Sequence, residues 1–293
     1  MEHPTGQQYG IVHGDWEATV TEVGAHLRSL RHRSRELLWT FGESEPPHNS
    51  QGAQLTPWPN RIRDGRWELH GVVHQLPINE PERGTALHGL ATDKPWQVIG
   101  RDEALVRQRL ELPPQEGWPG TLEVELVHSV TDEGLVVEFL ATNTGELPVP
   151  CGYGAHPYFA FPLAESSLEV PFSKELLVDD RLLPLEVADV TPERDFRQAR
   201  VVGEVALDTA FTAPATPRWE VVVHGPPHGV RIFDAGGCDW LQIFTDPTRE
   251  AIAIEPMTCG PDAFNPGPTH TSDIMLEPGA TVGCRWGVGV TAQ

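Results

Sequence analysis

The chain has 293 residues, of which 42 are acidic and 21 are basic, so its formal net charge at pH 7 is −21. This charge disfavours nucleic acid and anionic membrane surfaces as partners, because both repel an acidic protein. The sequence also contains 28 prolines and 28 glycines, and few long stretches lack both. Such frequent proline and glycine residues favour many short strands and turns over helices. We therefore expect an all-β protein.

The N-terminal segment has neither the basic start nor the apolar stretch of a signal peptide, and no run approaches the ~18 apolar residues of a membrane span. We expect a cytoplasmic protein that is a monomer or a homodimer. No linker, tandem repeat or low-complexity tract interrupts the sequence, which favours a single domain over residues 1–293. The four cysteines are widely spaced and form no C-x-x-C pair, which favours free thiols.

Alternation of apolar and polar residues predicts the strands of the first half of the chain. Expected strands lie at 16–23, 36–41, 96–101 and 104–112, and the segments 43–54 and 80–95 are expected to be connections. Between them, Asp64-Gly65 predicts a tight hairpin turn, and His70-Gly71 predicts a second turn before a strand at 72–76. A long hairpin is expected to pair 122–130 with 135–143.

The second half contains two stretches that depart from this alternation. Residues 150–161 are rich in glycine and aromatic residues, and residues 179–206 are acidic and weakly periodic. We expect the second stretch to be a loop with one short helix near 192–198. Further strands are expected at 219–224, 230–234, 241–245, 251–255 and 282–290.

The strand predicted at 251–255 ends on a carboxylate. Its alternation places Ile252 and Ile254 on one face and Ala251, Ala253 and Glu255 on the other. Pro256 favours an extended backbone at Glu255 and ends regular pairing soon afterwards. Beside two small residues, Glu255 is a candidate catalytic base at the floor of a pocket. The alternative is a solvated side chain at the rim of a sheet, which is the more common setting for glutamate.

Two histidines lie in similar settings. His88 precedes Gly89, and His156 follows Gly152 and Gly154, which leave little side-chain bulk on its face. A single histidine in such a place is more often a structural residue bonded to the backbone. Together with Glu255, however, they supply the imidazoles and carboxylate that acid–base catalysis near pH 7 requires.

Arg61 and Asp208 are candidate binding residues. A fixed guanidinium donates several hydrogen bonds to hydroxyl oxygens, and a carboxylate accepts them. The alternatives are a surface hairpin charge for Arg61 and a turn cap for Asp208. No H-E-x-x-H, P-loop, G-x-G-x-x-G or G-x-S-x-G motif is present, so we expect no metal and no organic cofactor.

Several of these residues occur in short motifs that together resemble the aldose 1-epimerase (galactose mutarotase) family. The ordered set spans most of the chain and consists of Asn60-Arg61-Ile62, Leu87-His88-Gly89, His156-Pro157-Tyr158-Phe159, Asp208 and Glu255. The resemblance implies a large antiparallel β-sandwich of the galactose mutarotase-like supersandwich type, with few short helices and a sugar site in an open cleft.

The resemblance also implies a role for each matched residue. Glu255 takes the proton of the anomeric hydroxyl, His156 protonates the ring oxygen, and Arg61, His88 and Asp208 hold the sugar. Opening a hemiacetal needs one proton removed and one supplied, so a base and an acid suffice without a cofactor. Trp58 and Trp240 are candidates for stacking on the sugar, although tryptophan is more often a core residue.

Two features leave the identity of the sugar substrate undetermined. Ala160-Phe161 stands where well-studied galactose mutarotases usually have Asn-Leu, and the segment 56–59 also differs from theirs. One alternative function is epimerisation of a hexose phosphate, for which Arg28, Arg31, Arg33 and Arg35 are the available phosphate clamp. Another is a non-catalytic carbohydrate sensor, which would not need both His156 and Glu255.

Overall fold

The structure is a computed structural model that describes residues 3–226 and 228–291. Strands dominate these residues, and the strand ladders are antiparallel. A three-residue 3₁₀ helix, η1 (Ser272–Ile274), is the helical element in the described part of the chain. The all-β expectation is confirmed.

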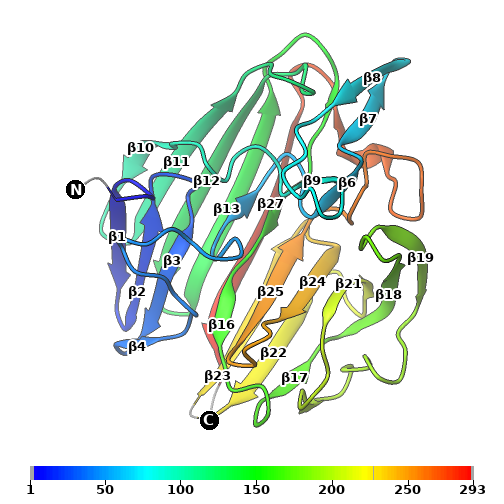
Figure 1. Ribbon diagram of the computed structural model, residues 1–293. Coiled ribbons are helices and arrows are strands. Elements are labelled where there is room, and N and C mark those ends of the chain that lie inside the picture. Colours follow the sequence, from blue (N-terminus) through cyan, green and yellow to red (C-terminus); the bar gives the residue numbers. More distant parts are fainter. Residues whose placement is uncertain (1–2, 227, 292–293) are drawn as a thin grey trace.

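The largest sheet has nine strands and forms one layer of the sandwich (Figure 1). The predicted long hairpin lies at its centre, each strand one residue longer than expected at the turn. Its order is β10 (Gln97–Arg101), β11 (Leu105–Leu112), β12 (Leu122–Thr131), β13 (Gly134–Asn143), β27 (Thr281–Val290), β23 (His228–Gly236), β22 (Glu220–Gly225), β17 (Ser167–Glu169) and β20 (Arg200–Val201).

A sheet of eight strands carries the candidate site residues Glu255 and Asp208. Its order is β19 (Pro184–Asp189), β18 (Phe172–Val178), β21 (Asp208–Pro214), β24 (Trp240–Thr245), β25 (Ala251–Met257), β15 (Gly154–Ala155) and β5 (Gln54–Leu55), with β16 (Tyr158–Ala160) paired to β25.

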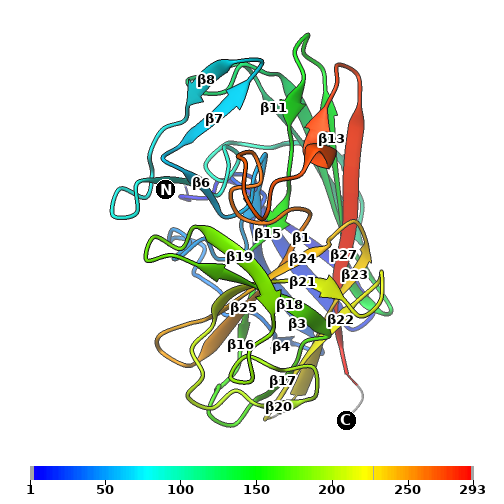
Figure 2. The same cartoon turned by 90° about the vertical axis from the view of Figure 1, so that its right-hand side faces the viewer.

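The N-terminal strands form a four-stranded meander of β1 (Gln8–His13), β2 (Trp16–Thr21), β3 (Leu27–His32) and β4 (Arg35–Glu36). Three two-stranded ladders complete the fold: β6 (Arg61–Arg63) with β9 (Thr85–Leu87), β7 (Arg66–Leu69) with β8 (Val72–Gln75), and β14 (Val149–Pro150) with β26 (Met275–Leu276). The hairpin of β7 and β8 stands at the upper end of the molecule in both views (Figures 1 and 2).

One contiguous hydrophobic cluster joins the three larger sheets. It contains Leu30 from the meander, Phe139 and Trp286 from the nine-stranded sheet, and Ile252 and Ile254 from β25. The predicted faces of β25 are therefore correct, because the isoleucines enter the main core. All four cysteines are buried and free.

Five local predictions are wrong. Of the strand expected at 36–41, only Glu36 belongs to a strand, β4, and the connection expected at 80–95 contains β9. Asp64-Gly65 does not connect a hairpin: β6 pairs with β9, about twenty residues further on, and β7 pairs with β8 across His70-Gly71. The expected loop 179–206 contains the strands β19 and β20.

The expected helix at 192–198 is also wrong, since this segment forms turns and bends. Asp195 accepts hydrogen bonds from the backbone and side chain of Arg197, which favours a local turn over helical pairing. Phe196 is buried, and its carbonyl accepts from Val170, so the segment is fixed by long-range contacts. In the described part of the chain, no helix is long and apolar enough to cross a membrane.

Candidate active site

Glu255 lies within β25, at the floor of the candidate site. Only 2% of its surface is exposed, so it is not the solvated rim residue of the alternative interpretation. Gln242 of β24 is its partner across the sheet, and β25 continues through Pro256 to Met257. Burial raises the pKa of Glu255 well above its usual range, and the nearby Asp208 carboxylate adds to this rise while Arg61 opposes it.

His156 lies against Glu255. Its Nε2 atom is 3.4 Å from Oε1 of Glu255, and both side chains are buried. The backbone of His156 is fixed on both sides, because its amide donates to Ala53 and its carbonyl accepts from Gly52. Burial lowers the pKa of His156 to about 4. The folded protein therefore disfavours charge on both members of this pair at neutral pH.

Aromatic rings hold the His156 imidazole in place. The Tyr158 ring stacks on it at a centroid distance of 5.0 Å, and the His88 ring meets it edge-on at 5.4 Å. The Nδ1 atoms of His88 and His156 are both buried without a hydrogen-bond partner among the described residues. Burial, with the neighbouring His156 and Arg61, lowers the pKa of His88 well below its usual range. Both imidazoles are therefore neutral and keep an unused nitrogen.

Small residues beside the pair do not leave empty space, contrary to the sequence prediction. Ala251 and Ala253 pack with Tyr158, and Trp39 and Phe244 lie against this group. At Gly154 an added Cβ would lie 2.8 Å from Pro59, so the glycine allows the close approach of this loop. The small side chains thus accommodate the aromatic rings and backbone that enclose the site.

The backbone around His88 adopts conformations that are uncommon for residues other than glycine. His88 and Asn60 have φ values of 64° and 57°, and the His88 amide donates to the Asn60 carbonyl at 2.8 Å. The adjacent Gly89 has φ of 78°, and a Cβ there would lie 2.2 Å from the Thr56 carbonyl oxygen, so only glycine fits. Such uncommon conformations often occur at functional sites.

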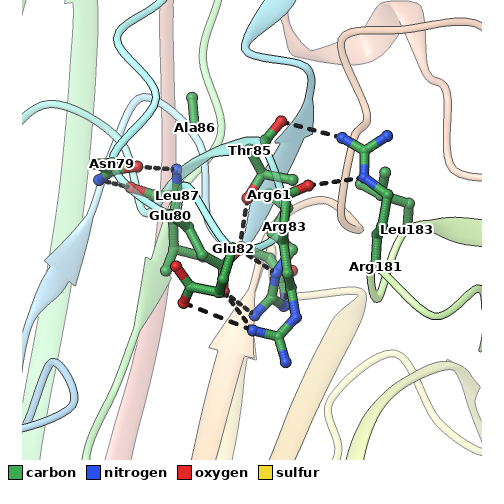
Figure 3. A network of polar contacts seen from close by, with 12 residues as sticks. Arg61, Asn79, Glu80, Glu82, Arg83, Thr85, Ala86, Leu87, Arg181 and Leu183 are labelled. Atoms are coloured by element: carbon green, nitrogen blue, oxygen red, sulfur yellow. Dashed lines mark hydrogen bonds and ion pairs between the residues drawn. The ribbon is translucent and has the colours of Figure 1, made fainter.

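Arg61 is clamped by a carboxylate that the sequence analysis missed (Figure 3). Its Nε and Nη2 atoms each donate to Glu80 at 2.8 Å, and Nη1 donates to Asn60 at 3.2 Å. Thr85 and Arg83 also donate to Glu80, which is itself buried. Three of the five guanidinium N–H groups are thus engaged, which leaves two for a ligand.

Asp208 lies at the open side of the site and is exposed. Gln242 donates to its Oδ1 atom at 2.6 Å and accepts from Asn60 at 3.4 Å. Atoms packed around the Asp208 carboxylate raise its pKa, whereas Arg61 lowers it. Arg61, Asp208 and Gln242 line one hollow together with apolar residues of β18 and β21.

The structure therefore brings the five candidate residues into one neighbourhood. His88, His156 and Glu255 form a buried chain of contacts, while Arg61 and Asp208 line the hollow beside it. Trp58 lies elsewhere: it is buried against Trp118 and Phe264 and cannot stack on a ligand. Among the described residues, no group of three or more histidine, cysteine or acidic side chains is arranged to hold a metal ion.

Comparison with known families identifies the chain. Residues 7–285 match the family described as aldose 1-epimerase, and the protein belongs to this family. It is 32% identical to the protein YihR of Escherichia coli (strain K12), which is described as uncharacterized, over 90% of this chain and 88% of YihR. It is also 27% identical to the galactose mutarotase of Homo sapiens, over 60% of this chain and 53% of that one. The matched part of the chain thus spans about half the length of that mutarotase.

Solved structures show the same fold. A GalM/aldose epimerase homologue from C. elegans has a TM-score of 0.86 at 20% identity, covering 97% of this chain and 98% of that one. A galactose 1-epimerase from Lactobacillus acidophilus NCFM has a TM-score of 0.82 at 18% identity, covering 97% and 95%. At these identities the likeness establishes the galactose mutarotase-like sandwich.

Proposed function

We propose that this protein is an aldose 1-epimerase that interconverts the α and β anomers of a free aldose. Glu255 accepts the proton of the anomeric hydroxyl, and His156 delivers a proton to the ring oxygen. The C1–O5 bond then breaks to give the open-chain aldehyde. Rotation about C1–C2 and the reverse proton transfers close the ring as the other anomer.

The contact between His156 and Glu255 carries this proposal. Ring opening moves one proton off O1 and one proton onto O5, so the pair needs to hold one proton throughout. An imidazolium beside a carboxylate is the arrangement from which ring opening starts, and a neutral His156 beside a protonated Glu255 is the arrangement that ring opening leaves. Burial keeps the pair close to this single-proton state, because it opposes both a charged Glu255 and a charged His156.

The other candidate residues supply binding in this proposal. Arg61 offers its two remaining N–H groups to sugar hydroxyls, and Glu80 fixes their direction. Asp208 accepts from hydroxyls at the open side of the site, and His88 presents its unused nitrogen. No metal or organic cofactor is assigned, since the two proton transfers need none.

A phosphorylated sugar is not favoured by these contacts. Arg31 pairs with Glu36 and Arg33 pairs with Asp15, on the strands and turn of the N-terminal meander. None of the four arginines considered as a phosphate clamp lines the hollow beside Arg61. The free aldose is therefore the better substrate class.

The variant Glu255→Gln tests the proposal directly. It keeps the shape of the side chain and removes the base, so kcat is expected to fall by roughly 10²–10⁴-fold while sugar affinity changes far less. The assay is polarimetry on a panel of freshly dissolved aldoses, corrected for the spontaneous reaction. A folded variant with near wild-type turnover would show that Glu255 is not the base, whereas no acceleration of anomer exchange by the wild-type protein would favour the non-catalytic sensor.

A further inference from the structure

A second cavity lies where the turn between β3 and β4 meets the start of β23 and the end of β27. Its volume is about 590 Å³, and its lining includes His32, Arg33, Arg35, Leu37 and His228. None of the five candidate active-site residues lines it. The cavity is therefore separate from the hollow that contains Arg61 and Asp208.

The lining of this cavity is cationic in a strongly acidic protein. Two arginines and two histidines contribute to it, and among the residues that the structure describes no aspartate or glutamate does, although the chain has twice as many acidic as basic residues. Arg33 pairs through Nε with Asp15 at 2.8 Å, a contact between two exposed side chains that are screened by water. The Arg35 charge acts on His228 across the cavity and, after burial, is the second cause of the lowered pKa of this histidine.

The two imidazoles are held by aromatic packing. The His228 ring lies 5.0 Å from the Phe161 ring, and the His32 ring lies 4.6 Å from the Trp16 ring. Both ring nitrogens of His228 are buried without a hydrogen-bond partner among the described residues. A buried polar group without a partner is unfavourable. His228 lines the cavity, so a ligand bound there can supply the partner that its ring nitrogens lack.

We propose that this cavity binds the phosphate group of a small phosphorylated metabolite at a site distinct from the sugar cleft. Guanidinium groups form paired hydrogen bonds to phosphate oxygens, and a neutral imidazole adds one N–H donor. The volume exceeds what a single phosphate fills and lies within the range of small-molecule sites. Leu37 and Val290 give the remainder of the ligand an apolar wall.

Thermal unfolding and calorimetric titration with inorganic phosphate test this proposal. The chloride concentration is lowered as phosphate is added, so that the ionic strength stays constant. Saturable stabilisation of the wild-type protein by phosphate is expected, because a ligand that binds only the folded state raises Tm. Arg35→Gln and His228→Gln should each weaken phosphate binding roughly tenfold or more, the usual effect of losing a hydrogen bond to a charged group. Arg285→Gln, which removes an exposed arginine paired with Glu138, is the matched control and should bind as the wild type does.

Two further measurements locate the anion. The same titration in Arg61→Ala should give the wild-type affinity, and saturating sugar should not compete with phosphate. Thermal unfolding in chloride, without phosphate, verifies that each variant is folded. Arg33→Gln provides a second substitution on the exposed side of the cavity. Equal stabilisation by chloride, unchanged affinity in both Arg35→Gln and His228→Gln, or loss of binding in Arg61→Ala would each overturn the proposal.

Discussion

Two buried histidines of this protein differ in what surrounds them. His128 of β12 is fully buried, and burial lowers its pKa to about 3, much as burial lowers that of His156 to about 4. His128 lies between the apolar neighbours Val106 and Val137 in the nine-stranded sheet, and neither of its nitrogens has a partner in the described part of the chain. His156 instead contacts Glu255. A low pKa therefore reflects burial alone, and acid–base chemistry requires a second titratable group within reach.

The largest expected effect follows from the contact that distinguishes His156. His156→Asn keeps a hydrogen-bond donor and removes the acid, so kcat should fall by roughly 10²–10⁴-fold. The double variant with Glu255→Gln should be little slower than the slower single variant, because residues that act as one unit are not additive. Rates of anomer equilibration check both statements. Independent, multiplicative losses would contradict a shared proton.

The clamp on Arg61 gives the next effect. Glu80→Gln leaves a buried guanidinium without its charge partner, and losing one partner of such a pair costs about 3–5 kcal/mol of stability. In addition, KM should rise more than kcat falls, because Arg61 loses its orientation. This split is measured from initial rates over a range of sugar concentrations.

A second ion pair, between a buried carboxylate and a partly exposed arginine, provides the control for Glu80. Glu175 is fully buried and accepts from Arg194 at 2.9 Å, on the core side of β18. Glu175→Gln should destabilise the protein without changing KM. If Glu80→Gln leaves KM unchanged as well, or if it raises KM further in an Arg61→Ala background, Glu80 does not act through Arg61.

Most of the fold could be predicted from periodicity, and the errors lie where the local apolar pattern does not determine strand pairing. The hairpin of β12 and β13 has strict alternation and a short turn, so local sequence determines its register. The Asp64-Gly65 turn is equally typical of a hairpin, yet β6 pairs with β9 instead. Strand β19 was missed because Pro184–Asp189 is a largely exposed edge strand whose pairing with β18 leaves little apolar pattern. Long-range pairing decided the first case, and the exposure of an edge strand explains the second.

The candidate site could be predicted only in part. Glu255, His156, His88, Arg61 and Asp208 were identified through ordered motifs, and their roles stay predictions until variants are assayed. Glu80 carries no local signal, because the ladder of β6 and β9 brings it to Arg61 across nineteen positions of sequence. Gln242 was missed for the same reason, since only the pairing of β24 with β25 sets it opposite Glu255. One domain over residues 1–293 also stays a prediction, supported by the core that the three sheets share.

The smallest expected effect is the contribution of His128 to the loss of protein stability in weak acid. Its folded-state pKa lies below the unfolded value of about 6.5, so the unfolded chain binds an extra proton in weak acid. The stability that His128 contributes is fully present above pH 6.5 and is lost as pH falls towards 3. The loss at pH 5 amounts to about 2 kcal/mol. His128→Leu should remove it, as measured by urea unfolding at pH 5 and pH 7.5.

The pair of His156 and Glu255 should behave differently in the same measurement. In the unfolded chain at pH 5, His156 is protonated and Glu255 is mostly ionised, so the two groups bind one proton. In the folded protein the pKa of His156 is lowered and that of Glu255 is raised, so they again bind one proton, now on Glu255. Near pH 5 the two shifts therefore oppose each other, and the pair adds little pH dependence to stability there. Glu255→Gln removes this compensation and leaves His156 as a second acid-sensitive histidine. The stability difference between pH 7.5 and pH 5 should therefore grow in Glu255→Gln and shrink in His128→Leu. An unchanged difference in Glu255→Gln would mean that Glu255 is ionised in the folded protein at pH 5.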